Sequence, residues 1–169
     1  LTHVHLDHAG GAGFFAERFP EMAVYVHESG ARHLASPDRL VEGTKRAVGD
    51  MWEFYADPKP IPEDRIETVA DGDVVSVGGR TFDVRSVPGH APHQVAFRDE
   101  AGPVFAGDAA GLWVPAYSEV VPTTPPPQFD LDTALADLET LRALDPDPLC
   151  YTHCGPGPAD ADAALDAYD

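Results

Sequence analysis

The chain has 169 residues, of which 43% are hydrophobic, and these values are typical of one globular domain with one sizeable core. Asp and Glu number 29 against 11 Lys and Arg, so the formal net charge is −18, and a field of that sign repels nucleic acid and anionic membranes. No stretch approaches the roughly 18 consecutive apolar residues of a transmembrane helix, so we expect no nucleic-acid and no membrane partner.

The acidic excess also bears on where the protein works. Only Lys45 and Lys59 are lysines, and dense surface carboxylates are typical of proteins from a salt-rich cytoplasm, where salt screens their repulsion. The alternative is a merely acidic protein from a mesophile. Cys150 and Cys154 fit neither a disulfide framework nor a zinc-ribbon pattern, so we predict a cytoplasmic location.

The first third of the chain is expected to be mainly helical. Gly10 and Gly11 precede a short apolar-periodic segment that Pro20 stops, and a longer helical pattern has Pro37 in its first turn. The expected elements are a helix over Ala12–Arg18, a buried strand over Ala23–His27, helices over Glu28–Ala35 and Pro37–Tyr55, and a loop over Asp57–Asp64.

From Ile66 the pattern changes to short apolar runs separated by turn signals such as Asp71-Gly72 and Gly78-Gly79. This alternation predicts a meander. Its strands are expected over Ile66–Val69, Val74–Val77, Thr81–Val87, Gln94–Phe97 and Val104–Phe105.

The remaining segment combines a proline-rich stretch with a leucine stripe. Pro122–Pro127 cannot be regular structure, whereas leucines recur at helical spacing after a cap at Asp130 or Asp132 and are expected in the core. These leucines are Leu131, Leu135, Leu138, Leu141 and Leu144. A last strand over Leu149–Thr152 and a last helix over Ala159–Tyr168 follow.

The strongest motif lies at the start of the chain, in Thr2-His3-Val4-His5-Leu6-Asp7-His8-Ala9-Gly10-Gly11. It gathers three imidazoles and one carboxylate within six residues. These are ligands of a borderline divalent ion such as zinc, and the short spacing lowers the entropy cost of assembling them. The alternative, a solvated His-rich terminus, does not account for Asp7 or the glycine pair.

Three later segments each offer one more ligand. His90 in Pro88-Gly89-His90, Asp108 after Phe105-Ala106-Gly107, and His153 after Tyr151-Thr152 each follow a short apolar run. Each is therefore expected where a strand ends and a loop begins, which is where α/β proteins gather site residues. The sequence predicts that seven ligands converge.

These residues resemble, in order and roughly in spacing, the signature of the metallo-β-lactamase-fold hydrolases, and the similarity covers nearly the whole chain. The resemblance implies an α+β fold of the αββα-sandwich type and two metal ions, zinc first, with iron or manganese as alternatives. It also implies the ligand sets: His3, His5 and His90 for one ion, Asp7, His8 and His153 for the other, and Asp108 as the bridge.

The same resemblance implies a metal-dependent hydrolase. Two cations that share a water lower its pKa to about 7 and so provide a hydroxide nucleophile. Asp7 is expected to have a second, catalytic role, in orienting the hydroxide and passing a proton to the leaving group.

The chain departs from the family at both ends. Members normally begin with several strands ahead of the H-x-H-x-D-H loop, whereas here Leu1 stands two residues before the first ligand. We therefore expect one partial domain over residues 1–169 that lacks the first strands. Only 16 residues follow His153, too few for the helical domain with which hydroxyacylglutathione hydrolases hold glutathione, so that assignment is disfavoured.

The substrate is expected to be a small molecule with an ester, thioester, lactone or similar bond. Trp52, Tyr55, Trp113 and Tyr117 fall in segments whose family counterparts overhang the metal site, where they would form an apolar pocket; core packing is the alternative. Phosphodiesters fit less well because cationic residues are few. Lactonases usually place a tyrosine soon after the bridging aspartate, and none stands there in this chain.

Two other classes stay open. A mononuclear iron oxidoreductase of the persulfide dioxygenase type uses fewer ligands, and a truncated fragment could keep the motif without catalysis. Flavin-linked di-iron members put Glu where His5 stands, which disfavours them. His27 and His33 are expected to be structural or surface residues and Cys154 to be inert. His93 is expected to be structural, a hydrogen-bond donor to the ligands or a contact of the substrate.

Overall fold

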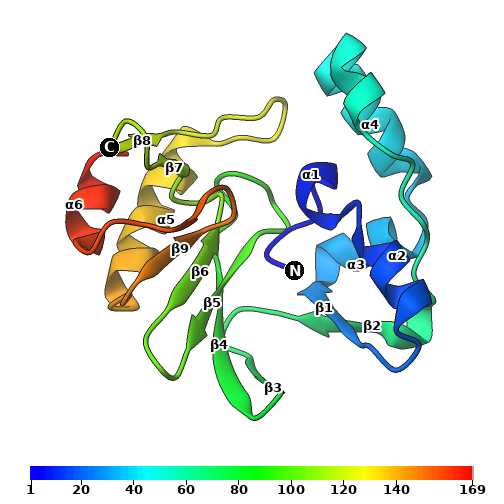
Figure 1. The fold of residues 1–169 in the computed structure, drawn as a ribbon, viewed down its shortest axis with the longest axis horizontal. Helices are drawn as coiled ribbons and strands as arrows, with labels where there is room; N and C mark the ends of the chain where they lie inside the picture. The colour runs from blue at the N-terminus through cyan, green and yellow to red at the C-terminus, as the bar shows by residue number, and fades with distance from the viewer. Residues whose placement is uncertain (169) are drawn as a thin grey trace. The chain divides into compact units, whose positions relative to one another are not determined.

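The computed structural model describes residues 1–168, and the chain divides into two compact units. One comprises Leu1 and His3–Val69, and the other comprises Thr2 and the residues from Ala70 onward. Both contain helices and strands (Figure 1), so the expected mixed α+β class is confirmed. One domain over 1–169 stays a prediction. Within residues 1–168, no helix has the length and apolar character needed to cross a membrane.

The first unit is mainly helical. Its elements are α1 (Leu6–Ala9), α2 (Ala12–Arg18), β1 (Val24–His27), α3 (Glu28–Ala35), α4 (Asp38–Val48), the 3-10 helices η1 (Gly49–Phe54) and η2 (Glu63–Arg65), and β2 (Ile66–Val69). Strands β1 and β2 pair in parallel, with Val24 opposite Ile66. The core brings together small and branched side chains of the leading segment, the helices and the strands: Val4, Ala9, Ala16, Val24, Val26, Leu34 and Ile61.

Arg65 ties this unit together at the end of α2. Its guanidinium donates to the carbonyl oxygens of Ala16 at 2.7 Å, Phe19 at 2.6 Å and Met22 at 2.6 Å. The last carbonyls of a helix have no partner within the helix, and a cation there also suits the helix dipole. One side chain from η2, directly before β2, therefore caps α2 and fixes the turn into β1.

Three expectations for this unit were wrong in detail. The helix expected over Pro37–Tyr55 ends at Val48, because Gly49 adopts φ +56°, and the chain continues as the 3-10 helix η1. The ligand loop is partly helical, since α1 contains Asp7 and His8. Strand β2 pairs with β1 and so lies outside the meander.

The second unit is built on a six-stranded sheet of order β10-β9-β6-β5-β4-β3. Its elements are β3 (Val74–Val77), β4 (Arg80–Ser86), β5 (Val95–Asp99), β6 (Val104–Gly107), β7 (Leu112–Val114), β8 (Glu119–Val121), α5 (Leu131–Ala143), β9 (Leu149–Tyr151), β10 (Gly155–Pro156) and α6 (Ala161–Asp166). Strands β3 to β6 form the expected meander, and β9 pairs with β6 in parallel.

Helices α5 and α6 pack on this sheet through one apolar cluster. Leu138 and Leu141 of α5, Leu165 of α6 and Leu149 of β9 are buried in it. Asp130 caps α5, since its carboxylate accepts from the backbone N–H of Thr133 at 2.9 Å. Leu131 was expected in this core but is 57% exposed, because it is the first residue of the helix. The β7–β8 hairpin was not predicted.

Candidate metal centre

In the first unit, the ligand segment is folded back on itself by α1. The backbone N–H groups of His8 and Ala9 both donate to the carbonyl of His5, at 3.0 and 2.8 Å. This turn gathers the imidazoles: the ring centroid of His3 lies 4.8 Å from that of His5 and 4.4 Å from that of His8. His3 is fully buried. The local fold of this segment therefore brings three imidazoles into one cluster.

Asp7 completes this cluster as a carboxylate. Its Oδ2 lies 3.3 Å from Nε2 of His8. Burial acts to raise the pKa of Asp7, but the hydrogen bond with His8 and the charges of His8 and His5 outweigh it and lower that pKa to about 2. Asp7 is therefore ionised at neutral pH, as a metal ligand must be.

In the second unit, three ligands follow three strands. His90 lies in the loop after β4, Asp108 directly follows β6, and His153 follows β9. Because β6 and β9 run in parallel, their carboxyl ends meet at one edge of the sheet, and the Thr152 N–H lies 3.4 Å from the Gly107 carbonyl. Gly107 adopts φ +62°, where a Cβ would meet Thr2, so the turn into Asp108 requires glycine.

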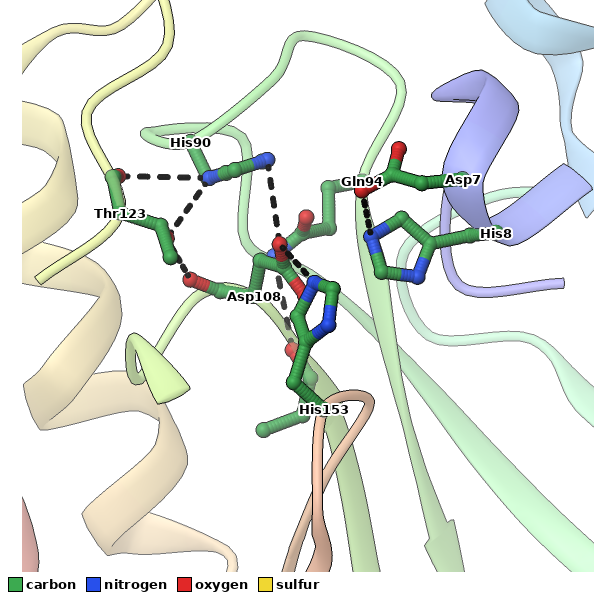
Figure 2. Close-up of polar contacts among 8 residues, drawn as sticks. Asp7, His8, His90, Gln94, Asp108, Thr123 and His153 are labelled. Atoms are coloured by element: carbon green, nitrogen blue, oxygen red, sulfur yellow. Dashed lines mark hydrogen bonds and ion pairs between the residues drawn. The ribbon is translucent and has the colours of Figure 1, made fainter. Parts of the chain in front are cut away.

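The carboxylate of Asp108 lies between two imidazoles (Figure 2). Its Oδ2 is 3.7 Å from Nε2 of His90 and 3.6 Å from Nε2 of His153. Both separations exceed a normal hydrogen bond. Ligand atoms held at roughly 2.0–2.2 Å by one zinc ion stand about 3 to 3.6 Å apart, so these donors are spaced almost as an ion would hold them.

Thr123, a residue that the sequence did not identify, fixes the tautomer of His90. Its hydroxyl donates to the Asp108 carbonyl at 2.9 Å, so it must accept from Nδ1 of His90, which lies 3.0 Å away. The Thr123 carbonyl, 3.4 Å from the same nitrogen, can also only accept. Nδ1 of His90 therefore carries the proton, and Nε2 presents its lone pair on the side of Asp108, as a metal-binding histidine requires.

All seven predicted ligands have donor atoms in candidate metal-ligand groups of imidazole nitrogens and carboxylate oxygens. This donor set suits zinc, iron or manganese and contains no thiolate. The structure thus brings together four of the seven within the first unit and three within the second. Their joint role as ligands stays a prediction.

The four predicted pocket residues lie in different settings. Trp52 and Tyr55 stack with ring centroids 5.7 Å apart and planes 4° apart, and Lys45 lies over the Trp52 ring. The pKa of the Tyr55 hydroxyl is raised by burial and by the charge of Asp7, which places Tyr55 near the ligand segment. Trp113 on β7 packs against the core of the second unit, whereas Tyr117 is 74% exposed in the β7–β8 turn.

Among the described residues, the candidate metal-ligand groups include neither the other histidines nor Cys154. His27 caps α3, since its Nδ1 accepts from the Ser29 N–H. His33 is half-buried on α3, and burial, Arg32 and Arg39 lower its pKa. His93 is buried. Cys154 is an exposed free thiol at φ +72°, in the turn after His153.

Residues 1–153 match the family model of the metallo-beta-lactamase superfamily. The chain belongs to this superfamily. The match includes all seven predicted ligands, and it confirms the family that the sequence resembles.

Two curated relatives illustrate the range of the superfamily. The chain is 27% identical over 159 residues to a metallo-beta-lactamase fold-containing protein of Sulfurisphaera tokodaii, covering 92% of the chain and 59% of that protein. It is 30% identical over 143 residues to the hydroxyacylglutathione hydrolase of Xanthomonas campestris pv. campestris, covering 83% of the chain and 43% of that enzyme. The chain therefore spans about half the length of these relatives.

Solved structures confirm the fold. The crystal structure of the archaeal superfamily protein from Sulfolobus tokodaii superposes with a TM-score of 0.85 at 26% identity, covering 98% of the chain and 63% of that protein. A superfamily protein of Thermus thermophilus gives 0.67 at 25% identity, covering 99% and 58%. A protein solved in a di-iron-bound form gives a TM-score of 0.69 at 25% identity, covering 96% of the chain and 72% of that protein.

Proposed function

We propose that this chain is a metal-dependent hydrolase with a dinuclear zinc site. In this proposal, His3, His5 and His90 hold one ion, Asp7, His8 and His153 hold the other, and Asp108 bridges them. One observation carries the proposal: the Asp108 carboxylate faces Nε2 of both His90 and His153, while Thr123 holds His90 in the tautomer that can bind a metal. The clustered imidazoles of the first unit support it.

When bound, such ions supply Lewis acidity and make hydroxide available at neutral pH, so the protein needs no serine or cysteine nucleophile. Asp7 is ionised, and its carboxylate oxygens can accept a hydrogen bond from the attacking water and so orient it. In this proposal, Asp7 then passes the proton of that water to the leaving group. Thr123 keeps the proton of His90 on Nδ1 throughout.

The proposed substrate is a small molecule with an ester, thioester or lactone bond. The relative named hydroxyacylglutathione hydrolase supports a thioester-like substrate. The stacked Trp52 and Tyr55 offer an apolar surface near Asp7 for the acyl part. With only 11 lysines and arginines against 29 acids, the chain offers little to hold a phosphate.

We further propose that the protein works in the cytoplasm of a cell rich in salt. The free thiols of Cys150 and Cys154 are typical of a reducing compartment. The net charge of −18 supports the salt-rich setting.

The test measures whether the zinc-loaded full chain hydrolyses a p-nitrophenyl ester, an acyl thioester or a lactone. A phosphodiester serves as the contrasting substrate. Asp108→Ala should lower kcat/KM on the preferred substrate at least about 100-fold, because both ions lose a shared ligand. His33→Ala is the matched control and should stay near wild type. A wild-type chain that cleaves none of the three, or equal rates in the two variants, would contradict the proposal.

A further inference from the structure

An aspartate outside the ligand set lies buried on the apolar stripe of α5. Asp137 is 4% exposed and shares its helix face with Ala134, Leu138 and Leu141, at the spacing of a core-facing stripe. Aspartate is rarely buried unless it has a partner. The hydrogen-bond partner of Asp137 therefore indicates its role.

That partner is the backbone of the loop that carries His90. One carboxylate oxygen of Asp137 accepts the N–H of Gly89 at 2.6 Å, a short bond of the kind that an ionised acceptor makes. Gly89 is the residue directly before His90 and is itself buried. The side chain of Asp137 thus reaches from the sheet-covering helix to the ligand loop.

Two further contacts fix the position of Gly89. Its carbonyl accepts the backbone N–H of Asp130, the residue that caps α5, at 3.0 Å. A Cβ on Gly89 would fall within contact distance of the backbone of Ala134, so no side chain fits there. The donor, the acceptor and the Cα face of Gly89 are all held by α5.

The rest of the loop is closed by its own hydrogen bonds. The Val87 N–H donates to the Gln94 carbonyl at 3.1 Å, and the Gln94 N–H donates to the Ala91 carbonyl at 2.9 Å. These bonds fix the base of the loop, whereas the position of its tip relative to α5 depends on Gly89. On the opposite side, Thr123 fixes the ring of His90.

We propose that Asp137 is a positioning residue for His90: by holding the Gly89 N–H, it sets the place of the His90 ring and thereby the affinity of the site for metal. This inference rests on the proposed metal-binding function. It assigns the role to a hydrogen bond on the backbone of Gly89, the residue directly before His90, and groups that orient metal ligands act in a comparable indirect way in other proteins.

The test compares three variants of the full chain with zinc and cobalt alone as probes. Asp137→Ala removes the acceptor and should weaken zinc binding about 10- to 100-fold and change the visible absorption spectrum of the cobalt-substituted protein. Asp137→Asn keeps an acceptor oxygen and should stay within about threefold of wild type. Gly89→Ala should reproduce the loss, because the added methyl pushes the loop off α5.

A destabilised fold is separated from a displaced ligand by Leu141→Ala, which opens a cavity in the same helix without touching Gly89. It should lower the melting temperature at least as much as Asp137→Ala yet keep the cobalt spectrum and the zinc affinity. If Asp137→Ala instead binds zinc like wild type with an unchanged cobalt spectrum, the inference is overturned.

A second readout needs no metal. In metal-free protein, the Gly89 amide proton should resonate well downfield in the wild type and Asp137→Asn, and move upfield in Asp137→Ala, as measured by NMR. An unchanged shift overturns the contact itself. A wild-type chain that takes up neither zinc nor cobalt overturns the proposed function, and the Gly89 shift in the same samples still decides whether Asp137 holds the loop.

Discussion

The buried Asp137 should make stability depend on pH in a window that can be calculated. Burial raises its pKa from 3.8 to about 6, against the opposing effect of the Gly89 N–H. Between these values the folded state keeps the proton that the unfolded state loses, so this contribution to stability is full below pH 4 and is lost as pH rises through 6. Burial, together with the charges of Asp137 and Asp108, raises the pKa of the Tyr168 hydroxyl above its ordinary value of 10.0. Tyr168 therefore stays neutral throughout this window.

As pH rises from 4 to 7, the wild type should lose roughly 2 kcal/mol of its free energy of unfolding relative to Asp137→Asn, which has no carboxyl group to titrate. The figure follows because one pKa unit corresponds to about 1.4 kcal/mol. Urea denaturation of both proteins in the presence of a chelator measures the difference. Parallel curves for the two proteins over this range would show that Asp137 titrates normally.

The hydroxyl of Thr123 offers a second prediction for a single residue. Thr123→Val keeps the shape but removes the acceptor for Nδ1 of His90 and the donor to Asp108. We expect zinc affinity to fall about 10-fold, because the ring loses the contact that fixes its tautomer. Thr123→Ser retains the hydroxyl and should bind zinc nearly as tightly as wild type. Equal losses in both variants would point to packing rather than to the hydrogen bond.

Single residues also show what the sequence could and could not reveal. The clustering of His3, His5 and His8 was predictable, because their spacing is short and improbable by chance. Thr123 and Asp137 were not, because each acts on a residue more than 30 positions away through the fold. An aspartate on the apolar stripe of α5 is a signal that could have pointed to Asp137, since a buried carboxylate needs a partner.

At the scale of elements, the link that Arg65 makes from η2 to the end of α2 should matter for stability. Arg65→Ala leaves the carbonyls of Ala16, Phe19 and Met22 without their cationic donor and should destabilise the protein by about 2–3 kcal/mol in urea denaturation. Arg65→Lys should recover less than half of this, because an ammonium lacks the planar fork that reaches several carbonyls. Arg46→Ala, exposed on α4, is the control and should change little.

Elements with a clear local cause were predictable, and those decided by distant partners were not. The bounds of α2, α3 and β2 follow from glycine, proline and apolar spacing. The break at Gly49 was missed because helical spacing continues across it. The parallel pairing of β1 with β2 depends on residues about 40 positions apart, which no local pattern encodes.

At the scale of the whole molecule, the net negative charge should make stability depend on salt concentration. A net charge of −18 on 169 residues repels itself at low ionic strength, and 1 M salt shortens the Debye length to about 3 Å. The melting temperature should therefore rise by several degrees between about 0.1 M and 2 M KCl. A melting temperature that stays flat or falls with KCl would contradict adaptation to a salt-rich cytoplasm.

The central claim is that this chain holds two metal ions through its seven histidines and aspartates. Elemental analysis of the full chain after zinc loading and exhaustive dialysis tests it most directly. The account predicts close to two zinc ions per chain in the wild type and in His33→Ala, and at most one in Asp108→Ala, which lacks the proposed bridge. A wild type that retains no metal, or a single iron ion in place of a zinc pair, would contradict it.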